Sequence, residues 1–186
     1  MDGYYDPIVS HVLPAPIALC GVWGSCIPEV GAHISSYTGI PFVDLERQME
    51  HVLGASLLSI RGDSERILSL ERQCIREVSS IRPYPIIALR TETMWDEACR
   101  MLLATSKTIY VQIDFLTAQK RILEWCESKK YTRMLNLCGV NPSDTTGFQN
   151  LVALCERRYQ SVDTVVQAKR YHPRHIAQDL LTRMFD

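Results

Sequence analysis

A short segment near the amino terminus has the spacing of a phosphate-binding loop but not its chemical groups. The window Gly21-Val22-Trp23-Gly24-Ser25-Cys26-Ile27-Pro28 follows an apolar run and precedes a helical pattern. This is the context in which the motif G-x-x-x-x-G-K-[ST] binds phosphate. Gly21 matches the first glycine, whereas Cys26, Ile27 and Pro28 stand in place of the second glycine, the lysine and the hydroxyl residue. Taken by itself, the window is also compatible with a chance strand, turn and helix.

Each replacement removes a group that holds a nucleoside triphosphate. The glycine lets the backbone wrap around phosphate oxygens, the lysine neutralises the β and γ phosphates, and the hydroxyl coordinates Mg²⁺. Pro28 also lacks the backbone N–H that the first turn of a helix directs at an anion. These residues therefore argue against ordinary ATP hydrolysis or phosphoryl transfer.

The elements around this window alternate between short apolar strands and helices. Strands are expected at 16–20, 40–43, 85–89, 108–113 and 164–167, and helices at 28–37, 45–53, 64–80, 92–105, 116–126, 148–159 and 173–184. Between them, the polar stretch 127–147 predicts a functional or mobile loop. This alternation predicts a three-layer α/β sandwich with a five-stranded, mostly parallel sheet. Ligands of such sheets bind at the carboxyl ends of the strands.

Several charged side chains could supply ligands at that edge. Asp44 could hold a metal or a substrate, or instead cap a helix, and Glu46 follows it closely. Arg90 could replace the missing cation, or form an ion pair with an acid. Arg133 in the polar stretch and Arg158 near a helix end are either anion ligands or solvent-exposed arginines.

Trp23 brings a large apolar side chain to the mouth of the loop. It could fill the space that a nucleotide would need, face a partner, or pack against a neighbouring helix.

Composition limits the class of protein. The chain has 186 residues, 46% of them hydrophobic, and a net charge of -1, which fits one folded domain and disfavours disorder or a broad nucleic-acid surface. No apolar run approaches the roughly 20 residues of a membrane span, and the amino terminus is acidic. We therefore expect a cytoplasmic protein. The seven cysteines form no C-x-x-C pair, so we expect reduced, buried thiols and no metal site.

The wider order of segments, from about residue 16 to residue 185, carries more weight than any single motif. The window 39–46 has the pattern G-x-x-F-x-D-x-[DE], and 53–60 is close to G-x-S-I-x-x-I-F. Glu71 fits an R-x-x-E helix, Arg133 the arginine of R-P-L-L, and Arg158-Tyr159 lies near R-x-x-x-Y. In this order and spacing the chain resembles shikimate kinase, a small P-loop kinase of the nucleoside-monophosphate-kinase type.

The resemblance implies a P-loop kinase fold at 16–186, preceded by an extension at 1–15 and carrying a lid-like region at about 127–147. It also implies that Asp44 organises Mg²⁺ and that Glu46 takes the place of an acid that contacts shikimate hydroxyls. The departures lie at functional positions of the family. Beyond the phosphate loop, these are Leu68 and Cys155 in place of arginines, and Arg90-Thr91-Glu92 in place of a glycine run.

Two hypotheses follow. The first is a pseudokinase: a catalytically inactive shikimate-kinase-like protein that binds no cofactor and serves as a protein-binding, scaffold or regulatory module. Its partner would be another protein, and a second copy of the chain is possible. The alternative is a diverged ATP-dependent small-molecule kinase that uses Mg-ATP and relocated cations, with Arg90, Arg133 or Lys130 replacing the lysine.

Overall fold

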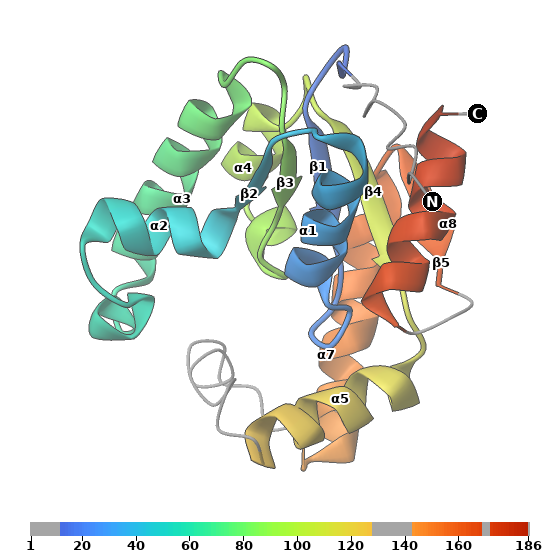
Figure 1. Ribbon diagram of the computed structural model, residues 1–186. Coiled ribbons are helices and arrows are strands. Elements are labelled where there is room, and N and C mark those ends of the chain that lie inside the picture. Colours follow the sequence, from blue (N-terminus) through green and yellow to red (C-terminus); the bar gives the residue numbers. More distant parts are fainter. Residues whose placement is uncertain (1–11, 128–142, 169–171, 186) are drawn as a thin grey trace.

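A five-stranded parallel sheet forms the centre of the protein, as Figure 1 shows for the computed structural model, which describes residues 12–127, 143–168 and 172–185. The strands are β1 (Ile17–Cys20), β2 (Phe42–Asp44), β3 (Ile86–Ala88), β4 (Lys107–Gln112) and β5 (Thr164–Gln167). Their order is β2-β3-β1-β4-β5, and all four pairings are parallel. The carboxyl ends of all five strands therefore lie at the same edge of the sheet.

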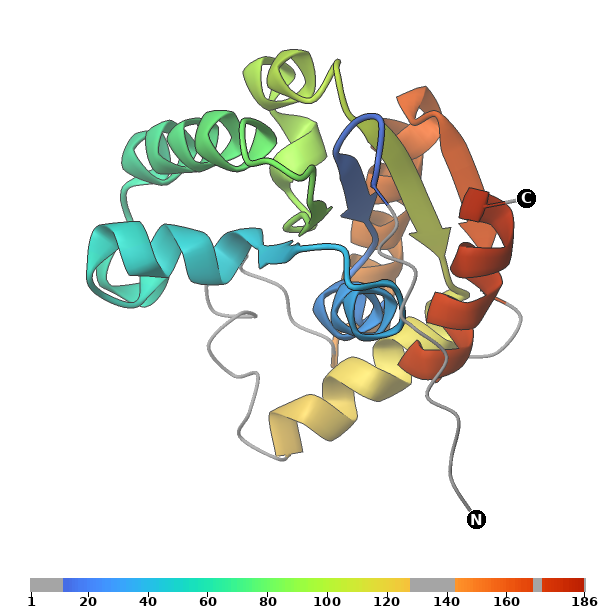
Figure 2. The same ribbon diagram turned by 45° about the horizontal axis from the view of Figure 1, so that its top comes forward.

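Helices cover both faces of this sheet. They are α1 (Ile27–Thr38), α2 (Leu45–Leu53), α3 (Ser64–Ser79), α4 (Glu97–Leu102), α5 (Phe115–Glu127), α7 (Thr145–Arg158) and α8 (Pro173–Phe185). Helices α1 and α8 pack together on one face, α4 and α7 lie on the other, and α2 and α3 lie side by side next to the β2 edge (Figures 1 and 2). The predicted three-layer α/β sandwich is confirmed.

The strands form where the sequence has short apolar runs. All residues of β1 and β3 are buried, because a parallel sheet with helices on both faces has no solvent-exposed side. Large apolar side chains from the helices, including Ile34, Leu45 and Phe148, complete the core on both faces. Within the described residues, none of the helices has the length and hydrophobicity of a membrane span.

Two predicted helices have different boundaries because of aspartate caps. The helix expected at 92–105 is divided into a 3₁₀ turn, η2 (Thr93–Trp95), and α4. Asp96 separates them because its carboxylate accepts a hydrogen bond from Cys99 N at 2.9 Å and pairs with Arg72 at 2.7 Å.

Asp144 caps α7 in the same way, through Gly147 N at 3.0 Å. The end of the stretch expected to be a loop at 127–147 is therefore helical from Thr145. Most of that stretch, with Arg133, lies outside the described residues.

The connection from β1 to α1 lies close against the backbone of α5 at Gly24. The backbone of Gly24 has a φ of 89°, and a Cβ atom there would lie 2.7 Å from the carbonyl oxygen of Ala118. Gly54 also has a positive φ, of 68°, but has open space around it, and Gly62 has open space without a positive φ. Alanine substitutions at these three glycines can therefore measure the cost of a left-handed backbone apart from the cost of a steric contact.

We expect Gly24→Ala to lower the free energy of unfolding by about 2–4 kcal/mol, since it combines left-handed strain with overpacking. Gly54→Ala should lower the free energy of unfolding by only about 1–2 kcal/mol, the cost of the left-handed conformation alone. Gly62→Ala is the matched control and should not lower stability. Urea denaturation of the three variants measures the series. Equal losses at Gly24 and Gly54 would contradict a steric role for Ala118.

Candidate functional site

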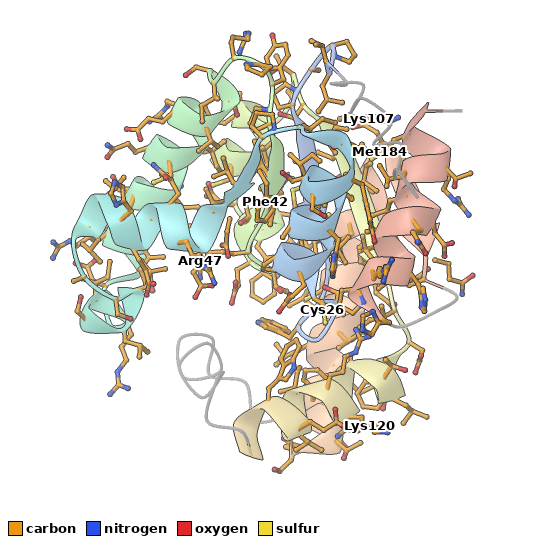
Figure 3. The ribbon with its side chains drawn as sticks, in the orientation of Figure 1. Cys26, Phe42, Arg47, Lys107, Lys120 and Met184 are labelled. Carbon is orange, nitrogen blue, oxygen red and sulfur yellow. The ribbon has the colours of Figure 1, made fainter. Side chains whose placement is uncertain are left out.

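The loop after β1 lies between β1 and α1, where the sequence predicts the phosphate loop, and has a cysteine in the glycine position. The carbonyl of Val22 accepts hydrogen bonds from Ser25 N at 3.0 Å and from Ser25 Oγ at 2.6 Å, which closes the turn. Cys26 then begins α1 with φ 58° and ψ 36°, a left-handed conformation that favours glycine. Figure 3 shows Cys26 at the end of the sheet that faces α5.

The charges beside this loop do not favour an anion. Pro28 has no backbone N–H, and Glu29 brings a carboxylate into the first turn of α1. A cation does approach from α5, but Arg121 Nη1 donates to the carbonyl of Gly24 at 2.7 Å. Burial raises the pKa of the Cys26 thiol to about 11, against the opposing effect of Arg121. Cys26 therefore remains a neutral thiol.

Asp44 and Glu46 lie at the end of β2 and the start of α2. Asp44 Oδ1 accepts hydrogen bonds from the backbone N–H groups of Glu46 at 3.1 Å and Arg47 at 3.3 Å, so Asp44 caps α2. Burial raises the pKa of Asp44, which these hydrogen bonds partly oppose. Burial also raises the pKa of Glu46 to about 7, although Arg90 acts in the opposite direction.

Arg90, which follows β3, is committed to carboxylates of the protein itself. Its Nη1 lies 3.3 Å from Glu71 Oε2, and its Nη2 lies 3.5 Å from Glu92 Oε2. The Glu71 residue is only 1% exposed, and its Oε1 accepts a hydrogen bond from Thr93 Oγ1 at 2.5 Å. Burial raises the pKa of Glu71, while Arg90 and Thr93 lower it. The ion-pair interpretation of Arg90 is the one that the contacts support.

A second set of contacts fixes the start of the phosphate loop. The carbonyl of Gly21 accepts a hydrogen bond from Thr91 Oγ1 at 3.0 Å. The hydroxyl of Tyr159 lies 3.1 Å from the same carbonyl oxygen and 2.8 Å from that of Thr91, so its single proton serves both acceptors. These bonds join the loop to the segment after β3 and to the end of α7.

The loop and the charged residues enclose one small pocket. Its volume is about 60 Å³, room for a few water molecules. Its lining consists of Gly21, Val22, Trp23, Gly24, Ser25, Cys26, Ile27, Pro28, Glu29, Asp44, Glu46, Ala88, Leu89, Arg90, Thr91 and Trp125. Three of these residues are acids and one is basic, so the lining carries an excess of negative groups.

Trp23 lines this pocket and is buried. It is 4% exposed, and its ring meets that of Trp95 edge-on, at 6.1 Å and 87°. Packing against a neighbouring element, one of the predicted alternatives, accounts for this side chain.

The sequence missed several residues of the site and misplaced another. Glu29 and Trp125 line the pocket, and Arg121 contacts the loop. Glu29 is adjacent to the loop in sequence, but Trp125 and Arg121 reach it only through the packing of α5. Arg158 does not line this pocket and lies in a separate one. Cys20, Cys26, Cys74, Cys99 and Cys155 are free and buried, as expected.

Comparisons with known proteins agree with the resemblance found in the sequence. No protein-family model matches the chain. Among curated proteins, the chain is 27% identical over 179 residues to the shikimate kinase of Dictyoglomus turgidum, covering 91% of this chain and 97% of that protein.

Solved structures show the same fold. The shikimate kinase from Acinetobacter baumannii in complex with shikimate has a TM-score of 0.75 at 18% identity and covers 91% of this chain and 92% of that chain. The shikimate kinase from Aquifex aeolicus has a TM-score of 0.70 at 18% identity, with coverage of 91% and 95%. These relatives point to the shikimate kinase family and its P-loop fold, and they fit the kinase alternative better than the pseudokinase hypothesis.

The pair of Arg90 and Glu71 gives a stability prediction. Arg90→Met should lower the free energy of unfolding by about 3–5 kcal/mol, because it leaves the buried Glu71 carboxylate without its cation. Arg90→Met combined with Glu71→Leu should recover most of this loss. Lys120→Met removes the cation of an exposed pair with Glu124 and should change little. Chemical denaturation of the native chain, these three variants and Glu71→Leu alone measures the coupling, and additive losses would contradict it.

The raised pKa of Glu46 gives a pH prediction. Between its ordinary pKa near 4.5 and its folded value of about 7, the folded chain holds more protons than the unfolded chain. Stability should therefore fall as pH rises through this window. Between pH 5 and pH 8, we expect the free energy of unfolding of the native chain to fall by about 1–2 kcal/mol relative to that of Glu46→Gln. A stability difference that does not vary with pH would contradict this.

Proposed function

We propose that this chain is a shikimate-kinase-like protein that has lost phosphoryl transfer and serves as a protein-binding or regulatory module. The observation that carries the proposal is the loop from Gly21 to Pro28, which lies between β1 and α1 where a phosphate loop is expected but lacks the side chains that bind phosphate. The partner in this proposal is another protein, with self-association as a further possibility.

The residues present do not fit Mg-ATP. Ile27 is apolar and buried where an ammonium would meet the β and γ phosphates, and Pro28 offers neither a hydroxyl nor an N–H. Glu29 adds negative charge at the same helix end. Asp44 is occupied as a helix cap, and Mg²⁺ is usually held by one or two carboxylates together with substrate phosphates. A pocket of about 60 Å³ is also small beside the about 300–1,000 Å³ of ligand sites.

The charges at the place where a phosphoryl acceptor would bind support the same proposal. The cation that follows β3, Arg90, is balanced by Glu71 and Glu92, and Glu46 lies near it as a further acid. An anionic acceptor would therefore meet an environment rich in carboxylates. We infer that the site has lost recognition of shikimate as well as of the nucleotide.

A second candidate is the diverged kinase, which the relatives favour. One structural feature supports it: a pocket of about 430 Å³ lies on the other side of Cys26, lined by Cys26, Glu29, Arg121, Glu124, Trp125, His172 and Pro173. In this candidate Arg121 would leave the carbonyl of Gly24 and supply the missing positive charge to a nucleotide. The two candidates differ in whether the chain binds Mg-ATP at all.

Isothermal titration calorimetry of the native chain with Mg-ATP, and separately with shikimate, tests the proposal. We expect no binding heat with either ligand, and no rise of the melting temperature, because a ligand that binds only the native state would stabilise it. Micromolar binding of Mg-ATP would favour the kinase. In that case Arg121→Gln should abolish it.

A matched variant shows that the assay can detect restored binding. Cys26→Gly, Ile27→Lys and Pro28→Ser together return the missing glycine, ammonium and hydroxyl to the loop. We expect this triple variant to gain affinity for Mg-ATP without phosphorylating shikimate. Full turnover by the triple variant would contradict the loss of the acceptor site.

A further inference from the structure

We propose that the chain carries a second binding groove, at the amino-terminal ends of β4 and β5, for a small molecule that joins an apolar body to an anionic head. This groove lies far from the phosphate loop. Figure 3 shows Lys107, the first residue of β4, at the opposite end of the sheet from Cys26. The proposal does not depend on whether the chain transfers phosphate.

Two adjoining pockets form the groove. The first has a volume of about 430 Å³ and is lined by Met94, Glu97, Arg100, Met101, Leu103, Ala104, Ser106, Thr108, Ser161 and Asp163. The second has a volume of about 400 Å³ and is lined by Arg100, Arg157, Arg158, Gln160 and Ser161. They share Arg100 and Ser161, so one ligand can reach both. Each volume is within the range of about 300–1,000 Å³ for small-molecule sites.

The first pocket holds a buried hydroxyl that is not used by the described part of the chain. Ser106 is 6% exposed, and its Oγ has no hydrogen-bond partner among the described residues. Its polar neighbours bond each other, since Asp163 Oδ2 accepts from Thr108 N at 2.7 Å and from Thr108 Oγ1 at 2.8 Å. An unpaired buried hydroxyl is unfavourable, and in this proposal the Ser106 side chain turns toward the pocket to pair with a polar atom of the ligand.

Apolar side chains form part of the same lining. Met94 and Leu103 are buried residues of the lining, and Met101 extends from α4 as an exposed apolar side chain. This part of the groove suits an apolar body about the size of a six-membered ring. The polar groups of the same lining, Ser106, Thr108 and Asp163 among them, would set the orientation of that body.

The second pocket is basic. Arg100 Nη1 donates to the carbonyls of Met94 at 2.8 Å and Trp95 at 3.1 Å, which fixes its guanidinium where the two pockets meet. Arg157 and Arg158 come from the last turn of α7, are exposed, and form no ion pair with a described residue.

The acids of the groove belong to the first pocket. Glu97 is exposed there, and hydrogen bonds from Thr108 lower the pKa of Asp163. The lining of the second pocket contains three arginines and no acid. A carboxylate or phosphate head would therefore be placed in the second pocket, where guanidinium groups bind such oxygens strongly.

Phenyl phosphate is a suitable probe because it combines one ring with an anionic head. The full chain, labelled with ¹⁵N, would be titrated with phenyl phosphate at fixed salt and followed by NMR. Separate titrations with inorganic phosphate and with benzyl alcohol test the anionic head and the apolar body, respectively. We expect saturable shifts at Arg100, Ser106 and Ser161, and at least about tenfold tighter binding of phenyl phosphate than of either separate part.

Charge variants show whether the arginines recognise the head. Arg157→Gln with Arg158→Gln should weaken phenyl phosphate binding at least about tenfold. Arg61→Gln with Arg66→Gln makes the same change of net charge at exposed positions on and next to α3, and should leave binding within about twofold of the native chain. Equal losses in both double variants would overturn the proposal, because they would show a general charge effect.

Ser106→Ala tests the hydroxyl. It should weaken binding at least about threefold while leaving the melting temperature unchanged or raised, since it removes an unpaired buried group. Full retention of affinity would remove Ser106 from the site. Shifts that gather at Gly21, Cys26 and Arg90 instead would overturn the proposed groove altogether.

Discussion

The buried ion pair between Arg90 and Glu71 is the interaction on which the shape of the candidate site depends. A carboxylate as enclosed as Glu71 is tolerated only where a cation and hydrogen bonds compensate for its lost hydration, and here Arg90 and Thr93 do so. The pair fixes the segment after β3 against α3. That segment includes Thr91, which bonds the carbonyl of Gly21, and through it the start of the phosphate loop.

The charged groups near the loop are bound mainly to one another and to the backbone. Positive groups are present near the loop, but acceptors of the protein engage them: Arg90 by Glu71 and Glu92, and Arg121 by the carbonyl of Gly24. Recovering either cation for a ligand would leave a buried carboxylate or a loop carbonyl unpaired. The proposed loss of anion binding therefore rests on the packing around the loop as well as on the replacements at Cys26, Ile27 and Pro28.

The sequence was sufficient for the features that depend on local pattern. Short apolar runs located all five strands, and the window from Gly21 located the loop. The features that it could not supply depend on contacts between distant segments. Asp96 divides a predicted helix because Arg72 and Cys99 meet its carboxylate, and Tyr159 reaches Gly21 across the sheet. Nothing in the spacing of Arg121 or Trp125 indicated that α5 would lie against the loop.

The backbone of Cys26 shows what maintains the loop when phosphate ligands are absent. A left-handed conformation at a residue with a side chain persists only where the surroundings impose it. Two such constraints are present: the Gly21 carbonyl is held by Thr91 and Tyr159, and Gly24 is confined by the backbone of α5. The path of the loop is thus a property of how β1, α1 and α5 pack. A fold with this property can keep the form of a phosphate loop after its side chains have ceased to match the ligand.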